Sequence, residues 1–259
     1  MLSLGLSLKL QNPDILASRF GYSKYSIAFD GSNDKLASSD ATLPTKLAEE
    51  GFKGAGAISV WFQIHSSAST NGLIVNCQVD ANNRIFVQFK NSDGTVKCNY
   101  RGDGTTKSLS ISPGTSIKGD GKFHHILFTW ASDGNGQSFF DGDSQSTESS
   151  IASHNFAADK DFDDAGSVVT MGEAETGSTD LYGYVDNVAL LSGTHSVADA
   201  VAIYNNGIPA DLKGWSNTIV YFEFEEGSGE TTKSSVNHHL SYMEIAGATF
   251  STITPTNLS

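Results

Sequence analysis

The chain has 259 residues, with 16 Lys and Arg against 29 Asp and Glu, so its formal net charge is −13. This charge excludes nucleic acid as a partner, because phosphate binding depends on Lys and Arg, and an anionic membrane surface for the same reason. Charged residues make up 17% and hydrophobic residues 38%, which excludes a disordered chain and a charged helical bundle. The 26 glycines favour a β-rich protein with many turns.

The N-terminal segment differs in composition from the rest of the chain. MLSLGLSLKL alternates Leu with Ser and Gly and lacks the leading cations and the continuous apolar run of a secretory signal. No stretch approaches the roughly 18 apolar residues of a membrane span. We therefore expect no signal peptide and no membrane insertion. Residues 1–20 are predicted to form an attachment arm, followed by one domain at 21–259.

Asp-Gly and Asn-Gly dipeptides are spread along the chain, and they suit the tight turns of β-hairpins. Short alternating or apolar runs lie between them. The predicted strands are 25–30, 34–38, 57–64, 73–79, 84–90, 95–100, 107–111, 123–130, 136–141, 167–172, 182–191 and 218–225. Many short strands at this spacing indicate an antiparallel sandwich or barrel.

Two segments depart from the strand pattern. A short helix is predicted near 196–205, with Ser196 as its cap, Asp199 three residues later, and a stop at Gly207 and Pro209. The segment from Ser144 to Ala165 is polar and acidic, and we expect it to be an exposed loop.

The two cysteines and two of the tryptophans are predicted to lie in the core. Cys77 shares a strand face with Leu73, Val75 and Val79, and Cys98 shares one with Val96 and Tyr100. Reduced core thiols are expected, because free Cys is among the most buried residue types. Trp61 and Trp130 stand in apolar runs, whereas Trp215 follows Lys213-Gly214 and is a candidate to stack on a sugar ring or to pack against the helix.

Several runs, taken in order, resemble one family. They are YSIAFDGSNDKL (25–36), ISVWFQI (58–64), DGKFHHILFTW (120–130), GQSFFDGDSQ (136–145), VVTMGEAETGSTDLYGYVDNVALL (168–191), AIYNNGIPADL (202–212), YFEFEEGSGE (221–230) and GATFSTITP (247–255). This order resembles the concanavalin A-like lectin/glucanase superfamily, in its laminin-G-like and pentraxin-like branch. The resemblance implies an all-β jelly roll of two antiparallel sheets.

The N-terminal arm at residues 1–20 suggests a second resemblance. A Leu/Gly/Ser-rich arm that enters such a domain without a signal peptide resembles structural proteins of tailed bacteriophages. This resemblance implies a non-enzymatic decoration protein, made in the host cytoplasm and located on the virion. Its expected partners are other virion proteins and copies of itself, held through the arm, and cell-surface glycans. A homo-oligomer is expected, and trimer and pentamer both stay open.

A calcium-dependent lectin is the alternative that the polar loops favour. The pentraxin-like register implies that two oxygen-rich loops meet at one edge of the sandwich, and calcium prefers such ligands. The first loop holds Asp80, Asn82 and Asn83, and the second holds Glu173, Glu175 and Asp180. Asn82, Asn83 and Asp180, together with Trp215, are also the candidate carbohydrate ligands. Ala174 and Thr176 interrupt the acidic pattern of the second loop.

A weaker structural calcium site is predicted at Asp30, Asn33 and Asp34 beside the strand of Asp186. The other interpretation of this run is a turn whose side chains bond their own backbone.

Glycoside hydrolysis is the least favoured function. It needs two carboxylates about 5 Å apart, and only Glu223 and Glu225 in YFEFEEGSGE offer a pair on one face. Gly227 stands where the related enzymes carry a third carboxylate. The pairs His124-His125 and His238-His239 cannot chelate one metal as units, because adjacent strand residues point to opposite faces. No catalytic residue is therefore assigned.

Overall fold

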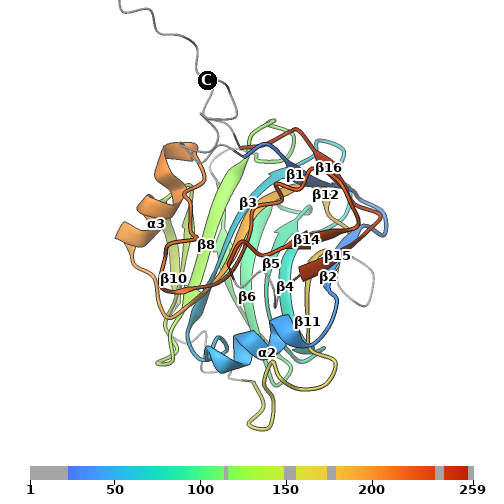
Figure 1. The fold of residues 1–259 in the computed structure, drawn as a ribbon. Helices are drawn as coiled ribbons and strands as arrows, with labels where there is room; N and C mark the ends of the chain where they lie inside the picture. Colours follow the sequence, from blue (N-terminus) through green and yellow to red (C-terminus); the bar gives the residue numbers. More distant parts are fainter. Residues whose placement is uncertain (1–22, 114–115, 149–155, 174–178, 237–241, 256–259) are drawn as a thin grey trace, which may run out of the picture.

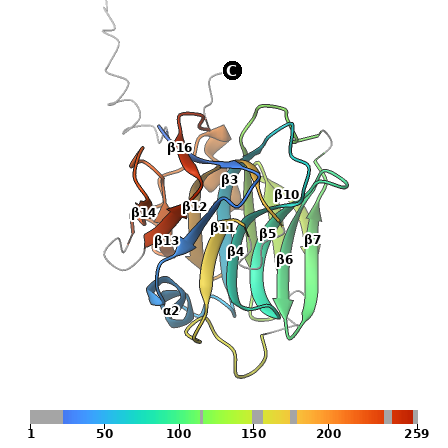
Figure 2. The ribbon, with the colours of Figure 1, turned by 90° about the vertical axis from the view of Figure 1, so that its right-hand side faces the viewer.

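The computed structural model describes residues 23–113, 116–148, 156–173, 179–236 and 242–255, which form two antiparallel sheets packed face to face. Figures 1 and 2 show the two layers from directions 90° apart. The predicted arm at 1–20 lies outside the described residues, as do Glu175 and the pair His238-His239.

The first sheet, sheet A, has the strand order β10-β9-β8-β3-β12-β1-β16, and β13 also pairs with β12. Its strands are β1 (Ser26–Asp30), β3 (Gly56–Ile64), β8 (His124–Trp130), β9 (Gly136–Phe140), β10 (Asp143–Glu148), β12 (Tyr182–Ser192), β13 (Thr218–Phe222) and β16 (Thr249–Ser251). Sheet B has the order β14-β15-β2-β11-β4-β5-β6-β7. Its strands are β2 (Lys35–Ser38), β4 (Gly72–Asp80), β5 (Asn83–Lys90), β6 (Thr95–Gly102), β7 (Thr105–Ile111), β11 (Val168–Gly172), β14 (Thr231–Lys233) and β15 (Tyr242–Ala246).

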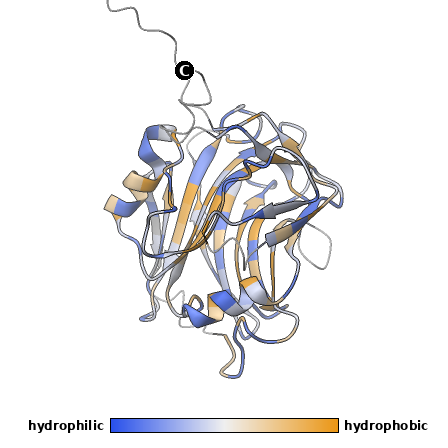
Figure 3. Ribbon diagram, in the orientation of Figure 1, coloured by the Kyte–Doolittle hydropathy of each residue, from blue (hydrophilic) through white to orange (hydrophobic). Residues whose placement is uncertain are grey.

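The main core lies between the two sheets, and Figure 3 shows hydrophobic residues concentrated in the central strands. Two large aromatic residues of this core also form hydrogen bonds through their polar atoms. Trp130 Nε1 donates to the carbonyl of Phe52 at 2.9 Å, and the Tyr100 hydroxyl donates to the carbonyl of Lys53 at 2.7 Å. Burial therefore removes apolar area from water and leaves neither of these two donors unpaired.

The predicted two-sheet sandwich is confirmed, and so is the core position of both cysteines. Cys77 on β4 and Cys98 on β6 are buried free thiols, and β5 runs between their strands. Burial raises the pKa of each thiol. Both side chains act as small hydrophobic residues.

The predicted exposed loop from Ser144 to Ala165 is correct for the irregular chain at 156–165 and wrong in two respects. Residues 143–148 form β10, which pairs with β9. Phe156 and Phe162 are 4% and 0% exposed and join the main core. Burial of two aromatic side chains removes a large apolar area from water, and this burial holds the otherwise polar segment against the sandwich.

A second, smaller core covers the outer face of sheet A. Helix α3 (Val197–Tyr204) and the chain after it pack there, as Figure 1 shows. This core contains Ala57, Leu127, Phe139, Ala189, Leu191, Ala200, Ile203, Leu212 and Tyr221. Trp61, predicted to be buried, is 2% exposed and stacks on Tyr204 of α3 with a centroid distance of 5.6 Å.

Helix α3 begins and ends where the sequence predicts. Ser196 Oγ accepts from the amide of Asp199 at 3.3 Å, and Asp199 Oδ2 accepts from the amide of Ser196 at 2.7 Å. This reciprocal pair is a capping box. Asn205 closes the helix in a left-handed conformation with φ 47°, and the 3₁₀ turn η2 (Asn205–Gly207) follows.

The structure adds elements that the sequence analysis did not predict, namely α2 (Thr42–Glu49), β14 and β15. In α2, Leu43 and Leu47 are buried in the main core at one end of the sandwich. Within the described ranges, neither helix is long and apolar enough to cross a membrane.

Candidate functional site

The two loops predicted to share a calcium ion lie at opposite ends of β4. Asp80 ends β4, whereas Glu173 follows Gly172, which pairs with Leu73 near the start of that strand. Seven residues of extended chain separate the two positions by about 23 Å. The expectation that these loops meet is wrong. Because β11 runs antiparallel to β4, the loop after β11 lies beside the start of β4, whereas the Asp80 turn lies at its end.

Asp80 and its neighbours form a hydrogen-bonded turn between β4 and β5. Asp80 Oδ1 accepts from the amides of Asn82 and Asn83 at 2.7 and 2.9 Å and from Asn83 Nδ2 at 2.9 Å. Asn83 Oδ1 accepts from the amides of Asp103 and Ala157 at 3.1 and 2.9 Å. Burial acts to raise the pKa of Asp80, but these hydrogen bonds outweigh it, and the pKa is lowered. These donors occupy the oxygens that a cation would need, and the turn therefore does not fit calcium.

The structure instead brings Asp180 close to the predicted cluster of Asp30 and Asp34. Asp34 Oδ2 accepts from the amide of Asp30 at 2.7 Å. Burial first, and then the charges of Asp30 and Asp180, raise the pKa of Asp34. The carboxylates repel one another there. No group of three or more His, Cys, Asp or Glu in the described part of the chain is arranged to hold a metal ion.

Asp186 does not join this cluster. It lies opposite Trp61, four residues along β12 from Tyr182, which pairs with Asp30. Asp186 is 0% exposed; its Oδ1 accepts from the amide of Asn187 at 2.7 Å, and its Oδ2 has no partner among the described residues. Burial raises its pKa well above the ordinary value, although Ser23 and the amide of Asn187 act to lower it.

The carboxylates after β13 stabilise the fold around them. Glu223 pairs with Lys213 Nζ at 2.8 Å and accepts from Ser235 Oγ. Glu225 Oε1 accepts from Ser23 Oγ at 2.9 Å and from the Lys24 amide at 2.8 Å. The strand ends at Phe222, so these two residues do not share a strand face as predicted.

The histidines of β8 also have local partners. His124 Nδ1 lies 2.8 Å from Asp141 Oδ2, and its Nε2 lies 2.9 Å from Asp120 Oδ2. His125 Nε2 lies 2.9 Å from Ser59 Oγ, and burial lowers the pKa of His125 to about 3. Both histidines are therefore packed and hydrogen-bonded within the sandwich.

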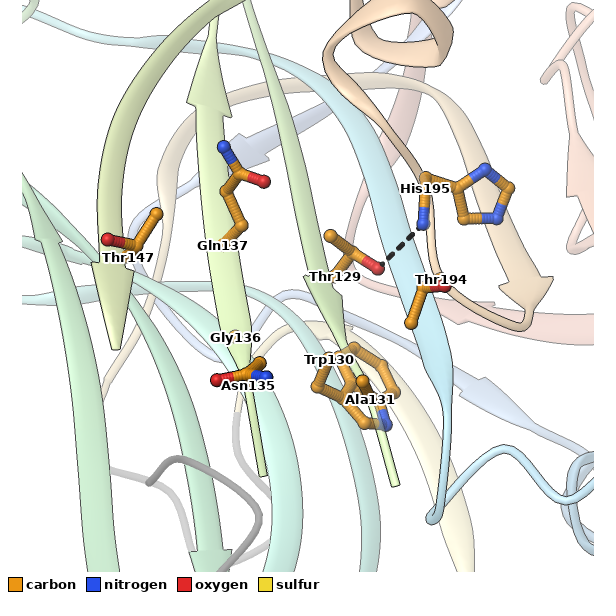
Figure 4. Close-up of a pocket in the computed structure, with 9 residues that line it drawn as sticks. All are labelled: Thr129, Trp130, Ala131, Asn135, Gly136, Gln137, Thr147, Thr194 and His195. Atoms are coloured by element: carbon orange, nitrogen blue, oxygen red, sulfur yellow. Dashed lines mark hydrogen bonds between the residues drawn. The ribbon is translucent and has the colours of Figure 1, made fainter. Parts of the chain in front are cut away.

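Two adjoining cavities lie beside α3 and share Thr194 and His195, and we call them together the His195 groove. The first has a volume of about 320 Å³ and is lined by Thr129, Trp130, Ala131, Asn135, Gly136, Gln137, Thr147, Thr194 and His195 (Figure 4). The second, of about 380 Å³, is lined by Thr194, His195, Asp199, Gly214, Trp215, Ser216 and Asn217. Both volumes lie in the range of small-molecule sites.

His195 joins the two cavities. Its amide donates to Thr129 Oγ1 at 3.2 Å, and Thr129 Oγ1 donates to the carbonyl of Gly56 at 3.1 Å, which fixes the segment to β8 and β3. The ring is 7% exposed and points away from Gln137 and Thr147 (Figure 4). Its Nε2 is buried without a partner among the described residues. Burial lowers the pKa of His195 and so favours the neutral ring.

The second cavity combines an aromatic ring with neutral polar groups. Trp215, predicted as a sugar ligand, is half-buried and packs against the smaller core, so its ring also contacts protein. Asn217 Nδ2 donates to the carbonyl of Ser192 at 3.1 Å. The Asp199 carboxylate accepts two hydrogen bonds from Ser196, and the bond from the backbone amide of Ser196 is the main reason that its pKa is lowered.

His195 was not predicted as a site residue. A single His two residues after Gly193 carries no motif, and only the packing of α3 on sheet A places it between two cavities. Asn82, Asn83 and Asp180, which the sequence analysis also named as carbohydrate ligands, do not line the His195 groove.

Comparison with known proteins agrees with this architecture. Residues 30–208 match the family model of the concanavalin A-like lectin/glucanases superfamily, and no curated protein matches the sequence. Among solved structures, a Bacteroides ovatus protein provisionally described as carbohydrate-binding superposes with a TM-score of 0.60 at 11% identity. The alignment covers 89% of this chain and 60% of that protein, so this chain spans less than two thirds of its length.

The heptameric SAP-like pentraxin of Limulus polyphemus superposes with a TM-score of 0.53 at 14% identity, over 87% of this chain and 96% of that one. At these identities the superpositions show the fold alone. The family model, in contrast, covers most of the sequence. Together with the two antiparallel sheets, this match means that the chain belongs to the concanavalin A-like lectin/glucanase superfamily.

Proposed function

We propose that this protein binds a neutral oligosaccharide in the His195 groove, with Trp215 as the platform for one sugar ring. The observation that carries the proposal is the buried, unpartnered Nε2 of His195, a residue that lines the same cavity as Trp215. A buried polar atom without a partner is costly. A sugar hydroxyl both donates and accepts, so it pairs with Nε2 in either tautomer of the ring.

The remaining groups of the groove favour a ligand without charge. Asp199 is the one carboxylate in the described lining, and its hydrogen bonds with Ser196 serve the helix cap. The amide nitrogens of Gln137 and Asn135 already donate to Ser144 and Asp133, and their amide oxygens can accept hydrogen bonds from hydroxyl groups. The carbohydrate-binding description of the Bacteroides ovatus protein supports the same ligand class.

We infer binding rather than hydrolysis. A glycosidase places two carboxylates on either side of the scissile bond. Glu223 and Glu225, which the sequence offered as such a pair, are engaged by Lys213 and by Ser23. The described lining of the groove supplies a single carboxylate.

Replacement of Trp215 tests this function. Isothermal titration with maltohexaose, cellohexaose and laminarihexaose is expected to give binding to at least one of them, and Trp215→Ala is expected to weaken it roughly ten- to a hundredfold. Trp215→Phe keeps the packing against the smaller core and should bind with intermediate affinity. Tyr242→Ala removes an exposed aromatic ring from β15 and serves as the control. Wild-type affinity in Trp215→Ala, or no binding of any hexasaccharide, contradicts the proposal.

The same titration separates this function from a calcium-dependent lectin. Binding in the His195 groove is expected to be equal in calcium and in EDTA, because the carboxylate of Asp199 is already engaged. Loss of binding in EDTA would support the lectin alternative that the sequence favoured and would direct attention to the loops at Asp80 and Asp180.

We propose display on a virion as the setting of this activity, with host glycans as the ligands. This setting depends on the arm at 1–20 and on its resemblance to phage structural proteins. Deletion of residues 2–20 is expected to abolish incorporation into particles while the domain keeps its thermal unfolding transition. Normal incorporation of the truncated chain contradicts the virion role.

A further inference from the structure

The outer face of sheet B places two of the chain's three arginines side by side. Ile85, Val87, Cys98 and Tyr100 point into the main core, so Arg84 on β5 and Arg101 on β6 point to the opposite face. The two arginines are paired in the strand register. Directly opposed residues of two antiparallel strands have Cβ atoms about 4.5–5.5 Å apart.

Neither guanidinium has an acidic partner among the residues that the structure describes. In the described chain, no carboxylate lies within ion-pair distance of Arg84 or Arg101, and every described ion pair is formed by Lys or His. Nε of each arginine is buried without a hydrogen-bond partner among the described residues. A protein with a net charge of −13 thus leaves two like charges opposed and uncompensated, which is unfavourable for the sheet by itself.

The surroundings hold Arg84 and Arg101 in place. The Arg84 guanidinium lies 4.6 Å from the ring centroid of Phe86, and Arg101 Nη2 donates to Asn82 Oδ1 at 3.4 Å. Burial, and then the charge of Arg101, lower the pKa of Arg84. An arginine nevertheless stays charged in a protein. Both cations are therefore present on this face at all physiological pH values.

The neighbouring side chains on this face include Phe86 and neutral polar residues. Asn76 on β4 and Asn99 on β6 flank Phe86 in the strand register. Asn76 is 0% exposed, and its Oδ1 is buried without a partner among the described residues. Ser108 Oγ on β7 donates to Asn99 Oδ1 at 2.6 Å. In Figure 2, β4, β5, β6 and β7 face the viewer, and neither described helix lies across them.

We propose that Arg84 and Arg101 form a second binding site, which holds the carboxylate or sulfate group of an acidic saccharide. Two guanidiniums side by side match the planar or tetrahedral oxygens of such a group through charge-assisted hydrogen bonds. The exposed hydroxyls of Thr106, which pairs with Arg101 in the strand register, and of Ser108 match the neutral hydroxyls of the same sugar. A nucleic acid does not fit, because its extended row of phosphates needs many cations, and on β5 and β6 this face adds only Lys90 and Lys97 to the pair.

This site lies on sheet B, whereas the His195 groove lies on the outer face of sheet A, so the two sites are independent.

Isothermal titration at low salt with a heparin-derived hexasaccharide and with hexagalacturonate tests the proposed acidic-saccharide site. At least one of them should bind, and Arg84→Gln and Arg101→Gln are each expected to weaken that binding roughly tenfold. Added salt should weaken it as well. A response to heparin alone identifies a sulfate ligand, and a response to hexagalacturonate alone identifies a carboxylate.

Lys122→Gln is the matched control, because it removes the same charge from an exposed residue ahead of β8. This variant should bind as the wild type does, and Trp215→Ala should keep its affinity for the acidic saccharide. Arg101→Lys keeps the charge without the planar fork and should bind with intermediate affinity. The melting temperature of each variant is recorded, and a rise of the wild-type value with the acidic ligand gives a second measure of binding. Equal losses in Arg84→Gln and Lys122→Gln, or no binding of either acidic ligand, overturn the proposal.

Discussion

Replacement of Gly172 by alanine is expected to lower the free energy of unfolding by roughly 2–5 kcal/mol. Gly172 ends β11 with φ +88°, and a Cβ added there would lie 2.2 Å from the ring of Phe29 and 2.7 Å from the carbonyl oxygen of Asp34. The left-handed backbone costs roughly 1–2 kcal/mol for a residue with a side chain. Crowding of the ring and of the backbone adds roughly 1–3 kcal/mol.

Gly166 is the matched control for this substitution. It has φ +91°, and a Cβ added there would meet nothing within 4 Å. Gly166→Ala should therefore show the backbone cost alone, roughly 1–2 kcal/mol. Urea unfolding of both variants measures the difference. Equal losses would mean that Phe29 and the Asp34 loop move aside without cost, which contradicts a tightly packed contact at the end of β11.

Replacement of Asp186 by asparagine is expected to stabilise the protein at pH 8 by roughly 1–3 kcal/mol and to have little effect near pH 4. Burial raises the pKa of Asp186 well above its ordinary value, so the folded state binds this proton more tightly than the unfolded state. The contribution of Asp186 to stability is fully present below the pKa of the unfolded chain, about 3.9. It is lost as the pH rises through the higher pKa of the folded state.

Urea unfolding at pH 4, 6 and 8 measures this dependence. The wild-type free energy of unfolding should fall relative to that of Asp186→Asn as the pH rises. Asp163→Asn makes the same charge change at an exposed residue and should stay within about 0.5 kcal/mol of the wild type at every pH. Parallel curves for the wild type and Asp186→Asn would mean that Asp186 is ionised in the folded protein and has a partner.

The two proposed sites use opposite faces of the sandwich. The His195 groove depends on the elements that cover sheet A, namely α3 and the segment around Trp215. The Arg84–Arg101 pair needs no covering element, because strand register alone places the two side chains together. Substitutions at one site are therefore expected to leave the affinity of the other unchanged.

Local patterns in the sequence determined most of the strands, the helix α3 and the core position of Cys77 and Cys98. Alternation along a strand and a capping box depend on neighbouring residues, which the sequence lists directly. The same rules missed β10 and the burial of Phe156, because the acidic residues between Ser144 and Ala165 outnumber the two aromatic ones. Burial depends on the apolar area that meets the core, and average polarity does not measure it.

Which residues come together in each candidate site was decided by the tertiary structure. The resemblance to the pentraxin-like branch implied one calcium site for Asp80 and Glu173, yet antiparallel pairing puts them at opposite ends of β4. His195 meets Trp215 only because α3 folds back on sheet A, and Arg84 meets Arg101 only because β5 and β6 pair in one register. Residue types and local alternation are properties of the sequence itself. Contacts between distant segments follow from how the sheets pair and pack, and that pairing alone decided which polar groups share a site.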